Sequence, residues 1–217
     1  MLLRADLDGA GSLLSELNEQ VPASRRAAIE TARAREAALR GANESADTGF
    51  RLAKQLREQA GLDEWARMSE LDLAELAARR GHLGAAEQSA RELRRAMLKA
   101  NDPHAGLQAG VLLAGVLSAQ SHIEQAERLL DELESELGSN PDALLTLRVD
   151  LLRASVRNSG KESALARVAT RAREVGFDLL ALRAEMLAGG DSAGQARAEL
   201  GRRGVSVDGM PPPIPYF

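Results

Sequence analysis

The sequence predicts an all-α fold in which antiparallel helix pairs stack into a solenoid, and three observations lead to this. Ala, Leu, Arg and Glu dominate the chain, and these are strong helix formers. Aromatic residues make up only 2% of it, which is low for a protein built of strands, and no stretch alternates as a strand does. The third observation is an internal repeat in which similar residues return at a fixed interval, the signature of a repeat architecture.

Alanine recurs at this interval in two series of fixed phase. The series are Ala34, Ala74, Ala114 and Ala154, and Ala46, Ala86, Ala126 and Ala166. Between them lies a turn position, as at Gly41 and Gly81. A small residue midway along each helix lets two backbones approach closely, and a Gly at the turn ends the first helix of each pair.

The individual helices follow from this phase. Apolar residues at helical spacing from Ala46 to Leu56 mark one second helix. The dipeptides Asp102-Pro103 and Asn140-Pro141 place a cap and a Pro at the starts of two first helices. The expected helices are residues 5–19, 22–40, 43–60, 62–80, 83–100, 103–119, 122–138, 141–158, 161–175, 177–188 and 191–203.

The first apolar stripe, Ala10, Leu14 and Leu17, has the phase of a second helix. Its partner would precede Met1, and a helix pair cannot bury its apolar face alone. We therefore expect residues 1–203 to be one helical repeat domain, the C-terminal part of a longer protein, followed by a Pro-rich tail at 204–217. The other interpretation is that residues 2–19 form a lone capping helix.

The pattern resembles the tetratricopeptide repeat over residues 5–203. The shared features are the small residue in the first helix, the turn Gly, the early Ala of the second helix, and a large apolar residue four positions later, as at Phe50 and Leu130. The chain departs from the family in its longer period and in Ala90 and Thr170, which replace that apolar residue in two repeats. The resemblance implies a right-handed superhelix. Its longer-period relatives include regulatory domains of bacterial transcription activators and signalling proteins.

The resemblance also implies a partner-binding concave face, because members of this family hold partners along the first helices of successive repeats. Ten positions carry over to this face: Arg35, Met68, Leu71, Glu75, Arg79, Gln108, Val111, Arg148, Leu151 and Ser155. The Lys and Asn clamp of chaperone-binding members is absent. The apolar strip of Leu71, Val111 and Leu151 suits an amphipathic helix or an apolar peptide, but it also suits packing between repeats, and the sequence leaves both open.

One motif suggests an enzyme. Gly190-Asp191-Ser192-Ala193-Gly194 matches the G-x-S-x-G of serine hydrolases, which requires a preceding strand and a later triad His. Here the preceding segment has helical periodicity, and all three histidines come before Ser192. We expect a helix–helix turn capped by Ser192 or Asp191, and no enzymatic activity.

Two further motifs point to turns rather than to ligand sites. His82 and His122 share one slot in adjacent repeats, but stacked helices lie about 10 Å apart, whereas zinc–nitrogen bonds are about 2 Å long. The Gly160-Lys161 pair has Ser155 and Glu162 where a phosphate-binding loop needs Gly and Ser or Thr. We therefore expect no metal and no cofactor.

Composition narrows the class of partner. A net charge of −4 argues against nucleic-acid binding, and no apolar run reaches the roughly 20 residues of a membrane span. The N-terminus lacks a signal-peptide pattern and the chain has no Cys, so we expect a cytoplasmic protein. Only three of the 28 basic residues are Lys, a bias typical of GC-rich bacterial genomes.

Two functions from different classes follow. The first is a protein–protein interaction scaffold that binds a partner peptide or helix on its concave face, within a bacterial regulatory or signalling protein. The alternative is an effector-sensing regulatory domain of a multidomain transcription regulator. A deep pocket closed at one end would favour the sensor, and an open groove would favour the scaffold.

The tail has four prolines in the five positions from Pro211, so it cannot continue a helix. It is either disordered or an apolar anchor. As an anchor it would bury Ile214 and Phe217 on the last repeats or in a second molecule, which would give self-association.

Overall fold

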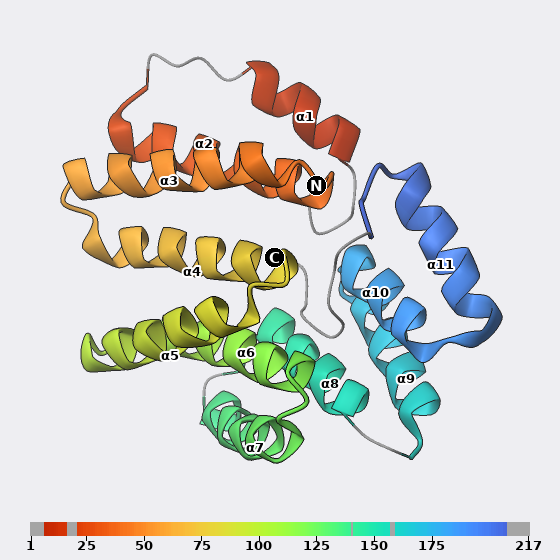
Figure 1. Cartoon of the computed structure of the whole chain (residues 1–217). Helices are drawn as coiled ribbons and strands as arrows, with labels where there is room; N and C mark the ends of the chain where they lie inside the picture. The colour runs from red at the N-terminus through yellow and green to blue at the C-terminus, as the bar shows by residue number, and fades with distance from the viewer. Residues whose placement is uncertain (1–6, 17–20, 140, 157–158, 208–217) are drawn as a thin grey trace.

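The computed structural model describes residues 7–16, 21–139, 141–156 and 159–207, and within these ranges the chain forms helices and no strand (Figure 1). This confirms the predicted all-α class. The helices pack consecutively along the chain. They are α1 (Leu7–Glu16), α2 (Ala23–Leu39), α3 (Asn43–Gln59), α4 (Asp63–Arg79), α5 (Leu83–Lys99), α6 (Pro103–Ala119), α7 (Ile123–Ser139), α8 (Ala143–Val156), α9 (Lys161–Glu174), α10 (Asp178–Ala188) and α11 (Gly190–Arg202).

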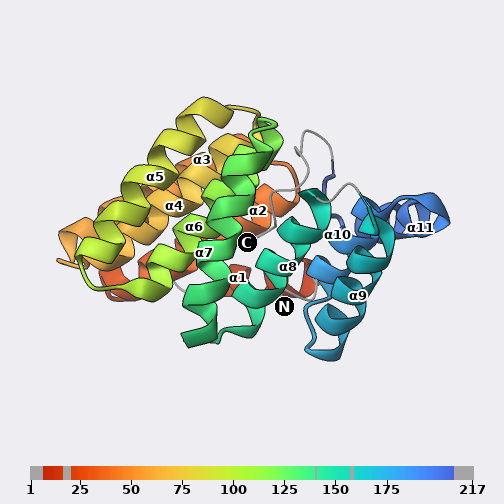
Figure 2. The ribbon, with the colours of Figure 1, turned by 90° about the horizontal axis from the view of Figure 1, so that it is seen from below.

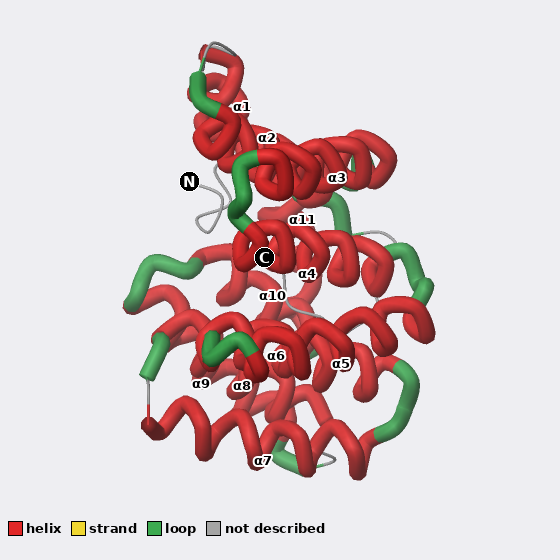
Figure 3. Tube along the Cα trace, turned by 90° about the vertical axis from the view of Figure 1, so that its left-hand side faces the viewer, coloured by secondary structure: helices red, strands yellow, loops and turns green. Residues whose placement is uncertain are grey.

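The helices α2 to α8 begin at a constant interval. Their first residues are 23, 43, 63, 83, 103, 123 and 143, so every start follows the one before it by the same length of chain. Two such intervals equal the spacing of the alanine series, and the pairs α2/α3, α4/α5 and α6/α7 are therefore the units that the series predicts. Seen from the side, α3, α4, α5 and α7 lie one below another (Figure 3).

The turns that join successive helices from α2 to α7 share one geometry. Gly81 follows α4 with a φ of 82°, and Ser121 follows α6 in the same slot with a φ of 64°. The next residue closes the helix by donating back to its last turn, from His82 N–H to the Ala77 carbonyl and from His122 N–H to the Leu117 carbonyl, both at 2.9 Å. A non-glycine residue in this left-handed conformation is strained by about 1 kcal/mol, so Ser121 carries a cost that Gly81 does not.

Ser121→Gly is expected to raise the free energy of unfolding by roughly 0.5–1 kcal/mol, because Gly adopts a positive φ without a Cβ clash. Gly81→Ala, in the equivalent turn, should lower it by about 1 kcal/mol. A Cβ at Gly81 meets nothing within 4 Å, so this loss reports the backbone alone. Urea unfolding measures both values, and a loss of stability in Ser121→Gly would contradict the turn geometry.

The alanines of the second helices lie at tightly packed contacts. Ala46, Ala86 and Ala126 are all 0% exposed. The fourth member of the series, Ala166, is exposed, so the prediction that the alanine contact continues into this repeat is wrong.

A shorter α8 explains the change, because it ends earlier than the preceding helices do and lets α9 begin early. α9 begins at Lys161 rather than at 163, where the constant interval would place its start. A shift of two positions corresponds to about 200° of rotation around a helix, which turns position 166 towards solvent. Ala164 and Val168 are buried in its place.

Ala86→Leu and Ala126→Leu should each lower the free energy of unfolding by roughly 1–3 kcal/mol, because no space exists for the added atoms. Ala166→Leu is the matched control, and its effect should stay within about 0.5 kcal/mol because the site is exposed. Thermal melts compare the three variants. Equal effects at all three positions would show that the buried and exposed slots are misassigned.

The expected cap of α6 is confirmed and that of α8 is wrong. Asp102 accepts a hydrogen bond from Ala105 N–H at 3.0 Å, with Pro103 as the first helical residue. In α8 the capping side chain is Asp142, which accepts from Leu145 N–H at 2.7 Å. The helix begins at 143, so a cap at 140 would stand too far from the first turn; Asn140 itself lies outside the described residues.

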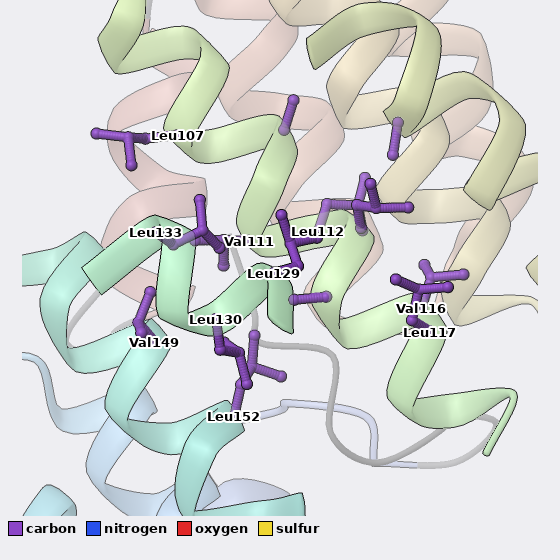
Figure 4. Close-up of a cluster of buried hydrophobic side chains, with 14 of the residues drawn as sticks. Leu107, Val111, Leu112, Val116, Leu117, Leu129, Leu130, Leu133, Val149 and Leu152 are labelled. Atoms are coloured by element: carbon purple, nitrogen blue, oxygen red, sulfur yellow. The ribbon is translucent and has the colours of Figure 1, made fainter. Parts of the chain in front are cut away.

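The helix α6 is the centre of the largest core cluster (Figure 4). Every residue from Ala105 to Leu117 is buried except Gln108. Leu130 and Leu133 of α7 and Val149 of α8 pack around it. Since α6 has neighbours on almost every side, Gln108 marks the direction in which packing is incomplete.

The C-terminal segment returns to the beginning of the array. Leu39, at the end of α2, shares an apolar cluster with Leu179, Leu200 and Val205. The Ser206 N–H donates to the Leu39 carbonyl at 2.7 Å. In Figure 2, α3 to α7 lie on one side of α8 and α9 to α11 on the other. The start of the predicted tail, 204–207, thus folds back, whereas 208–217, with the expected anchor residues Ile214 and Phe217, lie outside the described residues.

Candidate functional site

The first helices of the repeats, α2, α4, α6 and α8, enclose a hollow of about 190 Å³, here called the central cavity. Polar and charged side chains from all four helices reach it together with an apolar wall. Its lining is Arg35, Met68, Leu71, Asp72, Glu75, His104, Gln108, Val111, Leu112, Asp142, Leu144, Leu145 and Arg148.

An ion pair joins two neighbouring repeats at the wall of the cavity. Arg35 of α2 donates to Oδ1 of Asp72 in α4, from Nη2 at 2.9 Å and from Nε at 3.3 Å. Asp72 is only 5% exposed, and its Oδ2 has no hydrogen-bond donor among the described residues. Burial raises the pKa of Asp72, and the nearby Arg35 opposes that rise. One side of this carboxyl group is therefore satisfied and the other is not.

Glu75 lies about one turn further along α4, on the same face as Asp72. Burial raises its pKa from 4.5 to about 7. Arg148 of α8, Arg79 of α4 and Arg35 of α2 oppose this rise, while Asp72 adds to it. Its Oε1 is buried and, like the outer oxygen of Asp72, has no donor among the described residues.

The charges of the cavity are unevenly balanced. Its lining holds two guanidinium groups, Arg35 and Arg148, and three carboxyl groups, Asp72, Glu75 and Asp142. Burial lowers the pKa of Arg148, and Glu75 is the strongest influence in the opposite direction. With every group ionised the lining carries one net negative charge, in a setting that is largely removed from water.

Two further arginines hold the cavity-forming helix α4 in place. Arg79 donates from Nη2 to the Ala38 carbonyl at the end of α2, at 2.7 Å. Arg57 of α3 donates from Nη1 to Ser69 Oγ at 2.5 Å and to the Trp65 carbonyl at 3.2 Å. Both arginines are buried, so these bonds fix α4 against the preceding pair.

Seven of the ten residues predicted for the concave face line the central cavity, and three lie elsewhere. Arg79 forms the bond to α2 already described. Leu151 is fully buried in the apolar cluster of α8, α9 and α10. Ser155 donates from Oγ to the Leu151 carbonyl of its own helix at 2.7 Å. The seven in the lining are Arg35, Met68, Leu71, Glu75, Gln108, Val111 and Arg148.

Sequence reasoning missed Asp72, although a signal for it exists. The equivalent slots of the other three repeats hold Ala32, Leu112 and Leu152. A carboxyl group in a slot that is apolar in every other repeat marks a position with a special environment. Asp142, which was also missed, enters the lining because it caps α8.

The hydrolase-like motif lies in the first turn of α11, directly after α10 and without a strand. Ser192 is exposed, and its Oγ donates to the Gly189 carbonyl at 3.0 Å. The expectation that Ser192 or Asp191 caps this helix is wrong, because α11 begins at Gly190 and Gly189 occupies the cap position.

The other two motifs also fall in helix–helix turns. His82 and His122 each precede the first residue of a second helix and are exposed. Gly160 has a φ of 66° and stands immediately before α9. Within the described part of the chain, no group of three or more His, Asp or Glu side chains is placed to hold a metal ion.

No family model matches the chain, and neither a curated protein nor a solved structure matches it. Among the described helices, none combines the length and the apolar character that crossing a membrane requires. What the central cavity binds therefore has to follow from its own chemistry.

Glu75→Gln should stabilise the folded chain in a pH-dependent way. Below about pH 4.5 the Glu75 carboxyl is protonated in both states and costs nothing. Between pH 4.5 and about pH 7 the Glu75 carboxyl is ionised in the unfolded chain but still protonated in the folded chain. The free energy of unfolding of the wild type therefore falls as the pH rises through this range. The variant should therefore match the wild type at about pH 4 and exceed its stability by up to about 3 kcal/mol at about pH 8.

Urea unfolding at the two pH values measures this difference. Glu64→Gln, on the exposed first turn of α4, is the control and should change neither value. A constant difference between Glu75→Gln and the wild type across the range would show that Glu75 ionises normally in the folded chain.

Proposed function

We propose that the chain is a tetratricopeptide-like, right-handed α-solenoid that acts as a protein-interaction scaffold and not as an enzyme. The central cavity is the observation that carries this proposal. Successive first helices line this cavity, and in repeat proteins the concave face that binds partners is also formed by successive first helices. The resemblance to bacterial regulatory and signalling proteins, together with the arginine bias, supports a bacterial regulatory setting, and the lack of Cys fits the reducing cytoplasm.

The size of the cavity restricts what the partner inserts. About 190 Å³ is smaller than the roughly 300–1,000 Å³ of sites that enclose a drug-sized ligand. Leu71 and Val111 are buried, so the face offers a small pocket and not the open groove expected of a scaffold, but this pocket is also too small to be the deep effector pocket of a sensor. We therefore favour a partner that inserts one side chain of a peptide over one that lays a whole helix along the face.

A second candidate, effector sensing, is favoured by the contact between the two ends of the array. α2 carries Arg35 in the cavity and Leu39 in the cluster with Val205. A small effector that moves Arg35 would also move the end of α2 against the C-terminal segment. A change in packing at this contact is what a sensor needs to signal to a neighbouring domain.

A substitution that fills the central cavity tests whether the chain binds peptides there. A phage-displayed library of random peptides is panned against the wild type, and the enriched peptides are measured by titration calorimetry. Gln108→Trp places a large ring at the half-buried cavity wall and should abolish binding. Gln55→Trp, an exposed site on α3, is the matched control and should retain it. If no peptide of the library binds the wild type, or if the enriched peptides bind both variants equally well, the cavity is not a peptide site.

A further inference from the structure

The central cavity presents two carboxylate oxygens that can still accept hydrogen bonds. Asp72 Oδ2 and Glu75 Oε1 are buried on adjacent turns of α4, without a donor among the described residues. Asp72 is more than nine-tenths buried and lines the cavity, while its other oxygen is already held by Arg35. A buried acceptor without a donor costs about 1–3 kcal/mol, more if charged. A ligand that supplies N–H donors would remove that cost.

The charge of the lining selects among donors. With every group ionised the lining has three carboxylates and two guanidinium groups, so a bound cation balances the charge and favours the ionised form of Glu75. Arg35 already donates to Asp72 at 2.9 Å, so this carboxylate offsets part of the positive charge that an anion would need. Carboxylates prefer the paired N–H groups of a guanidinium, or the N–H groups of an ammonium, over neutral donors.

The remaining lining fits the stem of such a group. Met68, Leu71 and Leu144 add apolar surface to the lining beside its charged groups. Long basic side chains bury their methylene stems on apolar surface and direct their charged end to polar partners. A volume of about 190 Å³ accommodates a head group with a short stem.

We propose that the central cavity binds an alkyl guanidinium or alkyl ammonium group, with the carboxyl groups of Asp72 and Glu75 as its acceptors. The group belongs either to a basic side chain of a peptide partner or to a free small cation. In its peptide form the inference rests on the proposed function, and in its free form it is independent of it.

Titration calorimetry with two pairs of probes tests the proposal and separates the sources. The first pair represents a free cation and consists of agmatine and acetylated N-carbamoylputrescine. In the second compound a urea replaces the guanidinium group and an acetamide replaces the ammonium group, so it is neutral. The peptide pair is acetyl-Ala-Arg-Ala-amide and the same peptide with citrulline, which replaces the guanidinium by a neutral urea group. At least one cationic probe should bind, and its neutral partner should bind at least about tenfold more weakly.

Glu75→Gln should weaken the cationic probe about tenfold, and Asp72→Asn should do the same if the variant folds. Glu64→Gln, exposed on the same helix, should leave the affinity unchanged. Glu75→Gln is expected to be at least as stable as the wild type, so a loss of affinity in this variant cannot be attributed to unfolding.

Binding of agmatine alone would support the proposal with a free cation as the source, and binding of the arginine peptide alone would support it with a partner side chain. The proposal is overturned if neither cation binds at millimolar concentration, if citrulline equals arginine, or if Glu75→Gln and Glu64→Gln behave alike. Library peptides that bind in the cavity through uncharged residues would overturn the cation site while leaving the scaffold function intact.

Discussion

The constant interval between helix starts is the constraint on which the rest of the structure depends. Because the helices from α2 to α8 begin at equal steps along the chain, equivalent positions of the first helices meet at the centre. Met68, Gln108 and Arg148 occupy one slot in three successive repeats, and all three line the cavity. From α2 to α7 the helices are joined by turns that close with the same backbone bond and one left-handed residue. The turns, rather than the cavity residues, therefore decide which side chains come together.

The charged groups are an exception to the apolar packing that the repeats otherwise follow. A buried ion pair seldom adds net stability, because the cost of removing two charges from water offsets their attraction. The Arg35–Asp72 pair and the Glu75–Arg148 neighbourhood lie between first helices whose buried residues are mostly apolar. The domain keeps them beside a cavity where apolar residues would pack better. Recognition of a ligand gives a reason for this arrangement that stability does not.

Much of the fold was predictable from the sequence because repeats allow one unit to be read from another. The alanine series located the helix pairs, and carrying positions over from repeat to repeat placed Gln108 and Arg148 at the cavity. The same procedure failed where the repeats differ. It could not detect the shorter α8 and the early start of α9, and it passed over Asp72, whose equivalents are apolar. The return of Val205 to Leu39 depends on the summed curvature of many pairs, which no local pattern contains.

The helix α2 connects the two features that distinguish this array from a plain stack. Close to its end it offers Arg35 to Asp72 in the cavity and the Leu39 carbonyl to the Ser206 N–H. Arg79 reaches the Ala38 carbonyl between these points, so α4 holds α2 at two places. A cation at Oδ2 of Asp72 would add a second positive charge beside the carboxyl group that Arg35 holds, and would weaken the attraction between Arg35 and Asp72. The Arg79 bond to a backbone carbonyl does not involve Asp72, so α2 would keep this attachment while the contact of Arg35 loosens. Any shift of Arg35 would be passed along α2 to Leu39 and its contact with the C-terminal segment.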